Sequence, residues 1–408
     1  MAEQTHTRSK LEAFKRKSSR GLRVVFMSIV ALVTVFWASA VSASGTSVWS
    51  ISAQGTAGLP TGSLGQLSCS SPSACLAVGS ASTGQLVAAW NGTTWSRLGL
   101  PTGFGGTYAS SSGVACVSKG SCFVLESASG GTGANNGVLH WGGGRWTKEL
   151  RTTADPISIA CSGRLYCVAV FQGRSGRSIV FDTYVWRGAS WVRQPASGGG
   201  SPGYSDSFRS VACAKPSMCF AVGSEQNLET SSEVGLVEQW NGKRWTRMNV
   251  PQSGSYVILF GVSCGSPTRC VLVGSGDLGS KNYRAFSDVW DDSSWQLNPM
   301  PNPGVTAGSI GGENGASRIS LNGLSCAAAA SCDAVGYYSN DVTSPSSAVT
   351  EPLVEHFDGT SWSVVSSPPV AETGLANLSA ISCFARGCIA VGNPGNANSP
   401  PLIETSTA

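Results

Sequence analysis

Charged residues are scarce in this chain, and so are the residues that build long helices. Only 12% of the 408 residues are Asp, Glu, Lys or Arg, whereas 51 are Gly. Gly is a poor helix former, and a surface helix needs charged residues on its exposed face. The composition therefore excludes coiled coils and long-helix bundles. Apolar residues still make up 41% of the chain, so it can bury a core.

The body of the chain also has no surplus of basic residues. Of the 27 Lys and Arg residues, seven lie within the first 23 positions. Residues 44–408 then hold 20 basic and 21 acidic residues, a net charge of −1. Proteins that bind nucleic acid usually carry a basic excess. We therefore expect no nucleic-acid partner.

Residues 1–43 have the order of a secretory signal peptide. A basic stretch is followed by the apolar run Val24 to Trp37 and by small residues up to Ala43, the order that signal peptides show. The alternative is an uncleaved membrane anchor, because residues 24–43 contain no charge and are long enough to span a bilayer. Either interpretation predicts a secreted or cell-surface protein that touches a membrane only through this segment.

The cysteines recur at a regular interval. They form seven close pairs, six with the spacing C-x5-C and the last with C-x4-C. All lie in the body of the chain: Cys69 and Cys75, Cys116 and Cys122, Cys161 and Cys167, Cys213 and Cys219, Cys264 and Cys270, Cys326 and Cys332, and Cys383 and Cys388. The units that contain them start near residues 67, 114, 159, 211, 262, 324 and 381. A repeat of about fifty residues indicates a propeller or a solenoid.

Each unit contains four short segments typical of strands. In the fourth unit they end at Cys213, begin at Cys219, end at Trp240 and begin at Trp245. The segments are rich in β-branched and aromatic residues and are bounded by Gly, Asn, Asp or Pro. The Asn241-Gly242 step between two of them is a strong hairpin signal.

Pairing within each unit is the simplest arrangement of the cysteines. An exported chain with an even number of regularly spaced cysteines favours disulfides. Each would close the hairpin between the first two strands of its unit and contribute roughly 2 kcal/mol of stability. Zinc is the alternative, but it needs four converging ligands, and the chain has only 3 His. We expect neither a metal nor a cofactor.

The last unit is incomplete and the first segment after the leader completes it. The chain ends after Thr405 without a pair of Trp residues, whereas residues 47–52, around Trp49, resemble the fourth-strand segments. If this segment supplies the missing strand, the repeats close into a ring without free sheet edges. The sequence therefore predicts an all-β fold over residues 44–408: a seven-bladed β-propeller with four antiparallel strands per blade, whose last blade is closed by the N-terminal strand.

The repeat resembles a known family. One order of residues recurs along the chain: Val-Gly, an aromatic residue, Trp about five residues later, and then Pro. Examples of its last part are Trp95 to Pro101 and Trp245 to Pro251. This order is similar to Kelch-type β-propeller repeats and to secreted propeller repeats of high-GC bacteria. The single Gly and the cysteine pair of each unit differ from Kelch repeats. The resemblance implies a fold and no particular activity, because propellers serve many functions.

Functional residues are expected on one face of the ring. In an up-and-down blade, the turns between strands 1 and 2 and between strands 3 and 4 share one face, here called the turn face. The loops between strands 2 and 3 and the links between blades share the other, the variable-loop face, where sequence and length vary most. The candidate ligand-binding residues there are Tyr283, Arg284, Tyr337, Tyr338 and Asp341.

Two functions fit these residues. The favoured interpretation is a non-catalytic recognition or scaffold module for a glycan or protein outside the cell. The alternative is a secreted glycan hydrolase or lyase that uses carboxylates of the same face, of which the sequence offers Glu225, Glu229, Asp277, Glu313 and Asp341. We name no catalytic residue. The repeated Trp residues predict packing between sheets, and His140 and His356 predict local hydrogen bonds within strands.

Overall fold

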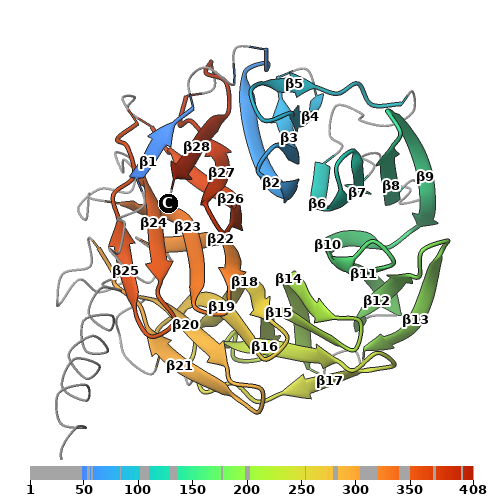
Figure 1. Ribbon diagram of the computed structural model, residues 1–408. Coiled ribbons are helices and arrows are strands. Elements are labelled where there is room, and N and C mark those ends of the chain that lie inside the picture. Colours follow the sequence, from blue (N-terminus) through green and yellow to red (C-terminus); the bar gives the residue numbers. More distant parts are fainter. Residues whose placement is uncertain are drawn as a thin grey trace, which may run out of the picture. The chain divides into compact units, whose positions relative to one another are not determined.

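The computed structural model is a ring of seven four-stranded sheets, and its described part contains no helix (Figure 1). The structure describes residues 48–52, 56, 58–82, 84–101, 110–127, 136–175, 178–197, 203–252, 254–278, 284–303, 319–339, 350–370, 374–396 and 398–407. The expected leader, residues 1–43, lies outside these ranges. No helix among the described residues has the length and apolar character that crossing a membrane requires.

The strands of each sheet follow one another in sequence and are antiparallel. The first strands lie nearest the centre of the ring (Figure 1): β2 (Gly62–Ser71), β6 (Ser110–Ser118), β10 (Asp155–Gly163), β14 (Tyr204–Lys215), β18 (Val257–Ser266), β22 (Ile319–Ala328) and β26 (Asn377–Phe384). The second strands are β3 (Ala74–Ala81), β7 (Ser121–Ser127), β11 (Tyr166–Ser175), β15 (Met218–Asn227), β19 (Arg269–Gly276), β23 (Ser331–Ser339) and β27 (Gly387–Asn393).

The third strands are β4 (Gly84–Trp90), β8 (Asn136–Gly142), β12 (Ser178–Trp186), β16 (Glu233–Trp240), β20 (Arg284–Trp290), β24 (Thr350–Phe357) and β28 (Leu402–Thr407). The outer strands are β5 (Trp95–Arg97), β9 (Arg145–Thr152), β13 (Trp191–Ser197), β17 (Trp245–Met248), β21 (Trp295–Pro299), β25 (Trp362–Val365) and β1 (Val48–Ile51). Blades are numbered 1 to 7 from the sheet of β2 to the sheet of β26.

The N-terminal strand closes the last blade, as the sequence predicts. β1 pairs antiparallel with β28, with Val48 opposite Thr407 and Ile51 opposite Glu404. The first strands of neighbouring blades contact each other all the way round, including β26 with β2. The sheets therefore form a closed ring. Because β1 covers β28, the third strand of every blade is paired on both sides.

All seven predicted disulfides are present, one in each blade. They join Cys69 with Cys75, Cys116 with Cys122, Cys161 with Cys167, Cys213 with Cys219, Cys264 with Cys270, Cys326 with Cys332, and Cys383 with Cys388.

The paired cysteines lie directly opposite each other on the first and second strands of their blade, as Cys213 and Cys219 do. The hairpin between these strands is therefore covalently closed, and the described cysteines include no free thiol. This complement of disulfides points to an oxidising compartment.

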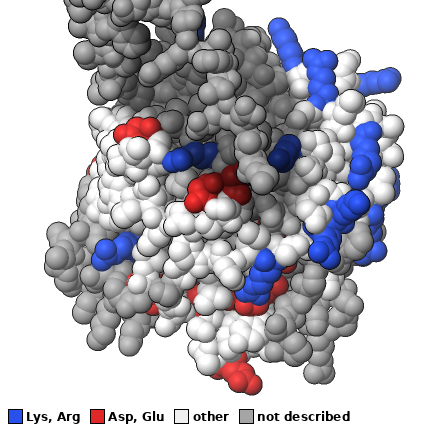
Figure 2. Space-filling model, turned by 60° about the horizontal axis from the view of Figure 1, so that its bottom comes forward, with Lys and Arg blue, Asp and Glu red and all other residues white. Residues whose placement is uncertain are grey.

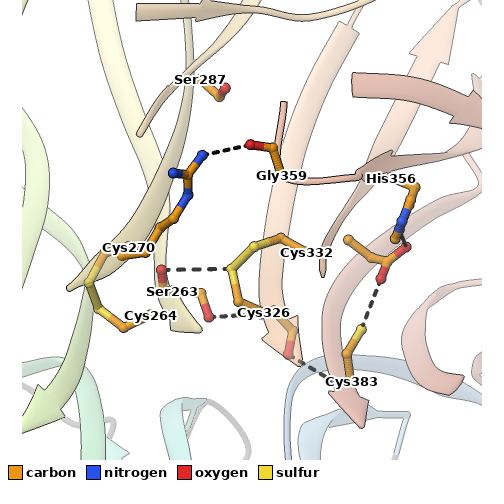
Figure 3. Close-up of a disulfide and its surroundings, with 12 residues drawn as sticks. Ser263, Cys264, Cys270, Ser287, Cys326, Cys332, His356, Gly359 and Cys383 are labelled. Carbon is orange, nitrogen blue, oxygen red and sulfur yellow. Dashed lines mark hydrogen bonds and ion pairs between the residues drawn. A yellow bond between two sulfur atoms is a disulfide. The ribbon is translucent and has the colours of Figure 1, made fainter. Parts of the chain in front are cut away.

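The hydrophobic core is divided among the spaces between blades. Seven clusters of buried apolar residues each join two neighbouring blades; one of them brings Leu64 of blade 1 against Val391 of blade 7. Serine hydroxyls also form hydrogen bonds between neighbouring blades. The Ser263 hydroxyl of blade 5 accepts a hydrogen bond of 3.0 Å from the backbone N–H of Cys326 in blade 6 (Figure 3).

The first strands begin earlier than the repeat pattern indicates. β2 starts at Gly62 and β14 at Tyr204, whereas the repeats are expected to start near residues 67 and 211. The reason is a β-bulge, which lies between Leu64 and Gln66 in blade 1 and between Phe208 and Ser210 in blade 4. A bulge breaks the alternation of inward and outward side chains, so the part of the strand before it lacks a strand pattern.

Candidate functional site

A polar pocket of about 550 Å³ lies on the variable-loop face at blade 3. Its lining comes from the link that follows β9, the end of β11, the start of β12 and the middle of β13. The charged and hydrogen-bonding residues among the lining are Thr153, Asp155, Gln172, Asp182 and Arg193. Because little of the lining is apolar, the pocket suits a polar ligand.

An ion pair fixes one wall of this blade 3 pocket. Arg193 Nη2 lies 2.5 Å and Nε 3.2 Å from Asp182 Oδ1, on the neighbouring strand. These hydrogen bonds raise the pKa of Arg193 above its usual value. Asn136 of blade 2 donates a hydrogen bond of 3.1 Å to Oδ1 of Asp155, which also lines the pocket. The pocket is thus held by both blades, and both of its carboxylates have defined partners.

A second pocket, of about 370 Å³, lies on the same face at blade 4. It is lined by Tyr204, Glu225, Asn227, Ser232, Val234 and Arg247. Arg247 donates two parallel hydrogen bonds of 2.7 Å to the two oxygens of Glu225. Bidentate pairs of this kind are strong and directional, so the guanidinium is held in one orientation at the pocket.

Asp206 adjoins this ion pair. It lies directly opposite Glu225 in the sheet and is 4% exposed. Burial, and the neighbouring negative charge of Glu225, raise the pKa of Asp206 to about 6. The hydrogen bonds from Arg247 lower the pKa of Glu225. At pH 5 the pair therefore holds one neutral and one ionised carboxyl group, a division that acid–base chemistry uses.

The two arginines occupy equivalent positions in their blades. Arg193 and Arg247 each lie two residues after the Trp that begins the outer strand, and the same position holds Arg97 in blade 1 and Lys148 in blade 2. In blades 5 to 7 the position is apolar, with Leu297, Val364 and Ile51. This recurrence separates blades 1 to 4 from blades 5 to 7, and it is the signal in the sequence that could have pointed to Arg193 and Arg247.

The structure places the sequence-predicted ligand residues apart from these pockets. Arg284 is exposed at the start of β20 in blade 5, whereas Tyr337 and Tyr338 lie half-buried near the end of β23 in blade 6. Tyr338 donates a hydrogen bond of 2.7 Å to Glu351. No interaction among the described residues joins Arg284 to either tyrosine. Tyr283 and Asp341 lie outside the described residues.

Among the described residues, no interaction brings together the carboxylates named for a hydrolase. Glu225 is bound to Arg247, Glu229 is exposed, and Asp277 accepts hydrogen bonds of 3.1 Å from the backbone N–H of Ser255. Glu313 and Asp341 lie outside the described residues. Asp206 is not among the residues predicted from the sequence, yet it is the carboxyl group that lies directly opposite Glu225 in the sheet.

Both histidines make the local hydrogen bonds predicted for them. His140 lies 2.8 Å from the Ser121 hydroxyl, and His356 Nδ1 lies 3.0 Å from Asp333 on the neighbouring strand (Figure 3). This hydrogen bond raises the pKa of His356. Asp333 also lies within 3.5 Å of the sulfurs of Cys383 and Cys388. Those two sulfurs are joined in a disulfide, so the group offers no thiolate to a metal.

The repeated tryptophans serve packing, as predicted. Eight of them are buried: Trp49, Trp95, Trp186, Trp191, Trp240, Trp290, Trp295 and Trp362. Several also tie blades together, because the indole N–H at the start of an outer strand reaches the third strand of the preceding blade. Trp245 donates to Thr183 at 2.9 Å and Trp362 donates to Ser287 at 2.8 Å. The eight buried rings are not available to stack on a sugar, whereas Trp90, Trp141, Trp146 and Trp245 are half-buried.

Comparisons with known proteins show the fold alone. No protein-family model and no curated protein matches the chain. Solved propeller structures do match it: YCF48 bound to D1 peptide (14% identity, TM-score 0.52), the WD40 β-propeller domain of Doa1 (9%, 0.51) and streptogramin B lyase (9%, 0.53). Each comparison covers 88% of this chain and 97% of the other. These neighbours include binding proteins and an enzyme, and the Kelch-type resemblance stays a prediction.

Proposed function

We propose that the protein is an exported, non-catalytic recognition or scaffold module that binds a glycan or a protein through its variable-loop face. The observation that carries this proposal is the pair of polar pockets on neighbouring blades of that face. Each combines an arginine held by a carboxylate with uncharged hydrogen-bonding groups. The disulfide in every blade supports export to an oxidising compartment.

The arginine side chains of these pockets are held in place before a ligand binds, which favours binding to a preformed site. The guanidinium groups of Arg193 and Arg247 are each fixed by two hydrogen bonds from their own nitrogens. Such groups lose little further freedom when a ligand binds, which favours affinity. The exposed Arg284 and the half-buried Tyr337 would extend the ligand surface toward blades 5 and 6, together with Tyr283, Tyr338 and Asp341.

A glycan hydrolase or lyase is the second candidate, and one observation favours it. Asp206 and Glu225 are neighbouring carboxyl groups whose pKa values are shifted in opposite directions, as in an acid and its partner base. The short separation of the two carboxyl groups, however, does not fit a glycosidase. Glycosidase carboxylates flank the substrate at about 5 Å or more, whereas Asp206 and Glu225 are hydrogen-bonded to each other. Binding without turnover is therefore the better-supported function.

A glycan array combined with a screen for hydrolase and lyase activity separates the two. We expect saturable binding without turnover, and at least tenfold weaker binding for Asn227→Ala or Arg247→Gln. Arg97→Gln is the matched control, because Arg97 occupies the same position in blade 1 and lines neither of the two pockets. Turnover that is lost in Asp206→Asn would establish the enzyme instead. Binding unchanged in all pocket variants would exclude this face as the site.

A further inference from the structure

The turn face of blades 2 to 4 carries only positive charge. The six hairpin turns there lie between paired Cys or Trp residues and contain no Asp or Glu. Their charged residues are all basic and all exposed: Lys119, Arg145, Arg164, Arg187, Lys215, Lys243 and Arg244. The corresponding turns of blades 5 and 6 contain Asp291, Asp292 and Asp358.

These basic side chains are not neutralised by the protein itself. None of the seven takes part in an ion pair within the described residues, where the arginine ion pairs are Arg193 with Asp182 and Arg247 with Glu225. Those two pairs belong to the variable-loop side of the same outer strands. The turn side therefore presents uncompensated charge to solvent, which raises the local positive potential.

The folding of the turns does not require basic residues. In blade 4, Asn241 Oδ1 accepts hydrogen bonds of 3.0 Å from the backbone N–H groups of Lys243 and Arg244. Asn91 does the same in blade 1, where the two residues are Thr93 and Thr94. In these two turns the Asn side chain and the Gly after it hold the hairpin, so the third and fourth positions are free to vary.

Residues 44–408 have a net charge near zero, but their positive and negative charges lie in different halves of the sequence. Residues 44–250, which include blades 1 to 4, contain 15 basic and 9 acidic residues, a net charge of +6. Residues 251–408 contain 5 basic and 12 acidic residues, a net charge of −7. In Figure 2 the Lys and Arg side chains gather along the right-hand side, the side on which blades 2 and 3 lie in Figure 1.

We propose that the turn face of blades 2 to 4 binds an acidic polysaccharide, independently of the ligand of the variable-loop face. The seven basic residues are spread over three blades and do not converge on one point, which suits a polymer with repeated carboxylate or sulfate groups. Arginine, which supplies four of them, forms bidentate hydrogen bonds with such oxyanions.

The same turns lack what other anionic partners need. Single-stranded nucleic acid is bound through exposed aromatic rings on which bases stack, and the described residues of these turns include no exposed aromatic. A membrane surface requires several apolar side chains for insertion. Leu165, at 72% exposure, is the one large apolar residue that is exposed within the described part of these turns.

The test measures binding of the purified protein to polygalacturonate, which carries carboxylates, and to heparin, which carries sulfates, with neutral dextran as the reference. We expect binding to one or both acidic polymers but not to dextran. The affinity should fall at least tenfold from about 50 mM to about 500 mM NaCl, because salt screens exposed charges. No binding to either acidic polymer, or equal binding to dextran, would refute the proposal.

Exchanging the residues of one turn tests whether the polysaccharide binds at the turn face of blades 2 to 4. Lys243→Thr with Arg244→Thr converts the blade 4 turn into the Asn-Gly-Thr-Thr turn of blade 1, and we expect about tenfold weaker binding from the loss of two exposed charges. A four-site variant adds Thr360→Lys and Ser361→Arg, which moves the two charges to blade 6 and restores the net charge. It should remain weak. Recovery of wild-type affinity would show that net charge alone acts.

Two further arms test the class of partner. Anionic phosphatidylglycerol vesicles and single-stranded DNA are offered to the same proteins at the same ionic strength. We expect both to bind more weakly than the better acidic polysaccharide. Tighter binding of either would replace the polysaccharide with a membrane or a nucleic acid. Thermal unfolding of each variant shows whether a lost affinity comes from the surface or from misfolding.

Discussion

At the scale of single residues, blades 5 to 7 each bury a carboxyl group at the same place in the third strand. Asp288, Glu355 and Glu404 are all 0% exposed. Burial raises their pKa values to about 7, 8 and 7. Glu404 accepts a hydrogen bond from the Ser367 hydroxyl, and Asp288 accepts one from Gln252. Within the described part of the chain, neither oxygen of Glu355 has a hydrogen-bond partner, so this group is protonated at neutral pH.

Stability should therefore decrease as pH rises. The folded protein holds the proton of Glu355 up to about pH 8, whereas the unfolded chain releases it near pH 4.5, so unfolding is favoured increasingly between these values. We expect about 5 kcal/mol less stability at pH 9 than at pH 4 from this group, because the pKa differs by about 3.5 units between the two states at about 1.4 kcal/mol per unit. Denaturant unfolding across pH measures it.

Glu355→Gln isolates the contribution of this carboxyl group. The amide cannot ionise, so the variant should unfold at higher denaturant than wild type at pH 9 and show a flatter pH profile. Glu229→Gln is the control, because Glu229 is exposed and its replacement should leave the profile unchanged. A Glu355→Gln profile parallel to wild type would show that Glu355 is ionised in the folded state.

At the scale of elements, the glycine of the Val-Gly step shapes five of the seven blades, whereas blades 2 and 3 carry Glu126 and Phe171 at the equivalent position. A Cβ atom on Gly223 would lie 1.9 Å from the Ser207 carbonyl oxygen of the first strand, and one on Gly336 would lie 1.8 Å from that of Ser320. The β-bulge of the first strand begins at this level. The close approach of the two backbones leaves no room for a side chain, which explains why the motif recurs.

Gly223→Ala should cost about 3 kcal/mol, because the methyl group meets backbone that cannot move without disturbing the sheet. Gly99→Ala is the matched control, since a Cβ there meets nothing within 4 Å. Thermal unfolding compares the two variants. If both unfold at the same temperature as wild type, the sheet absorbs the methyl group and the proposed reason for the motif is wrong.

Each disulfide hairpin should contribute a similar free energy to the stability of the fold. Replacing Cys213 and Cys219 together by Ala opens a short loop and should cost about 2 kcal/mol. The same change at Cys383 and Cys388, with a sequence separation of 5 in place of 6, should cost a similar amount. Chemical denaturation of both variants gives the two free energies of unfolding. A cost near zero in both would mean that the hairpins are held by the sheet alone.

At the scale of the whole molecule, the ring depends on a strand from the other end of the chain. Trp49 of β1 is 5% exposed and packs with Val335, Val354 and Leu378 of blades 6 and 7. A strand of only four residues thus anchors the closure through one large side chain as well as its backbone pairing.

Trp49→Ala should cost about 4 kcal/mol, as other buried Trp truncations do, and should also expose β28 as a sheet edge. Val48→Ala is the control, because Val48 is 65% exposed. Thermal unfolding and size-exclusion chromatography measure the two effects. A Trp49→Ala protein as stable and as monodisperse as Val48→Ala would show that the ring holds without the β1 anchor.

The features that the sequence predicted are those that repeat. Cysteine pairs, Val-Gly steps and Trp pairs recur with a fixed chemistry in nearly every blade, so blade number, disulfides and closure could be derived from them. The pockets depend on side chains that differ between blades. Asp206 lies before a bulge, where the strand pattern fails, and its contact with Glu225 follows from a register that only the folded sheet defines. Of the residues expected at the site, only Glu225 of blade 4 therefore lines one of the two pockets.

The closure of blade 7 imposes an order on biogenesis. Ser50 meets Thr405 at a sequence separation of 355, so the earliest-made part of the domain stays without its partner until the ribosome has delivered almost everything else. Blades 1 to 6 can assemble one after another as they emerge, whereas the final sheet cannot. Until β28 has been synthesised, the nascent domain is an open arc whose β1 segment has no partner strand, and chaperones can still bind this form.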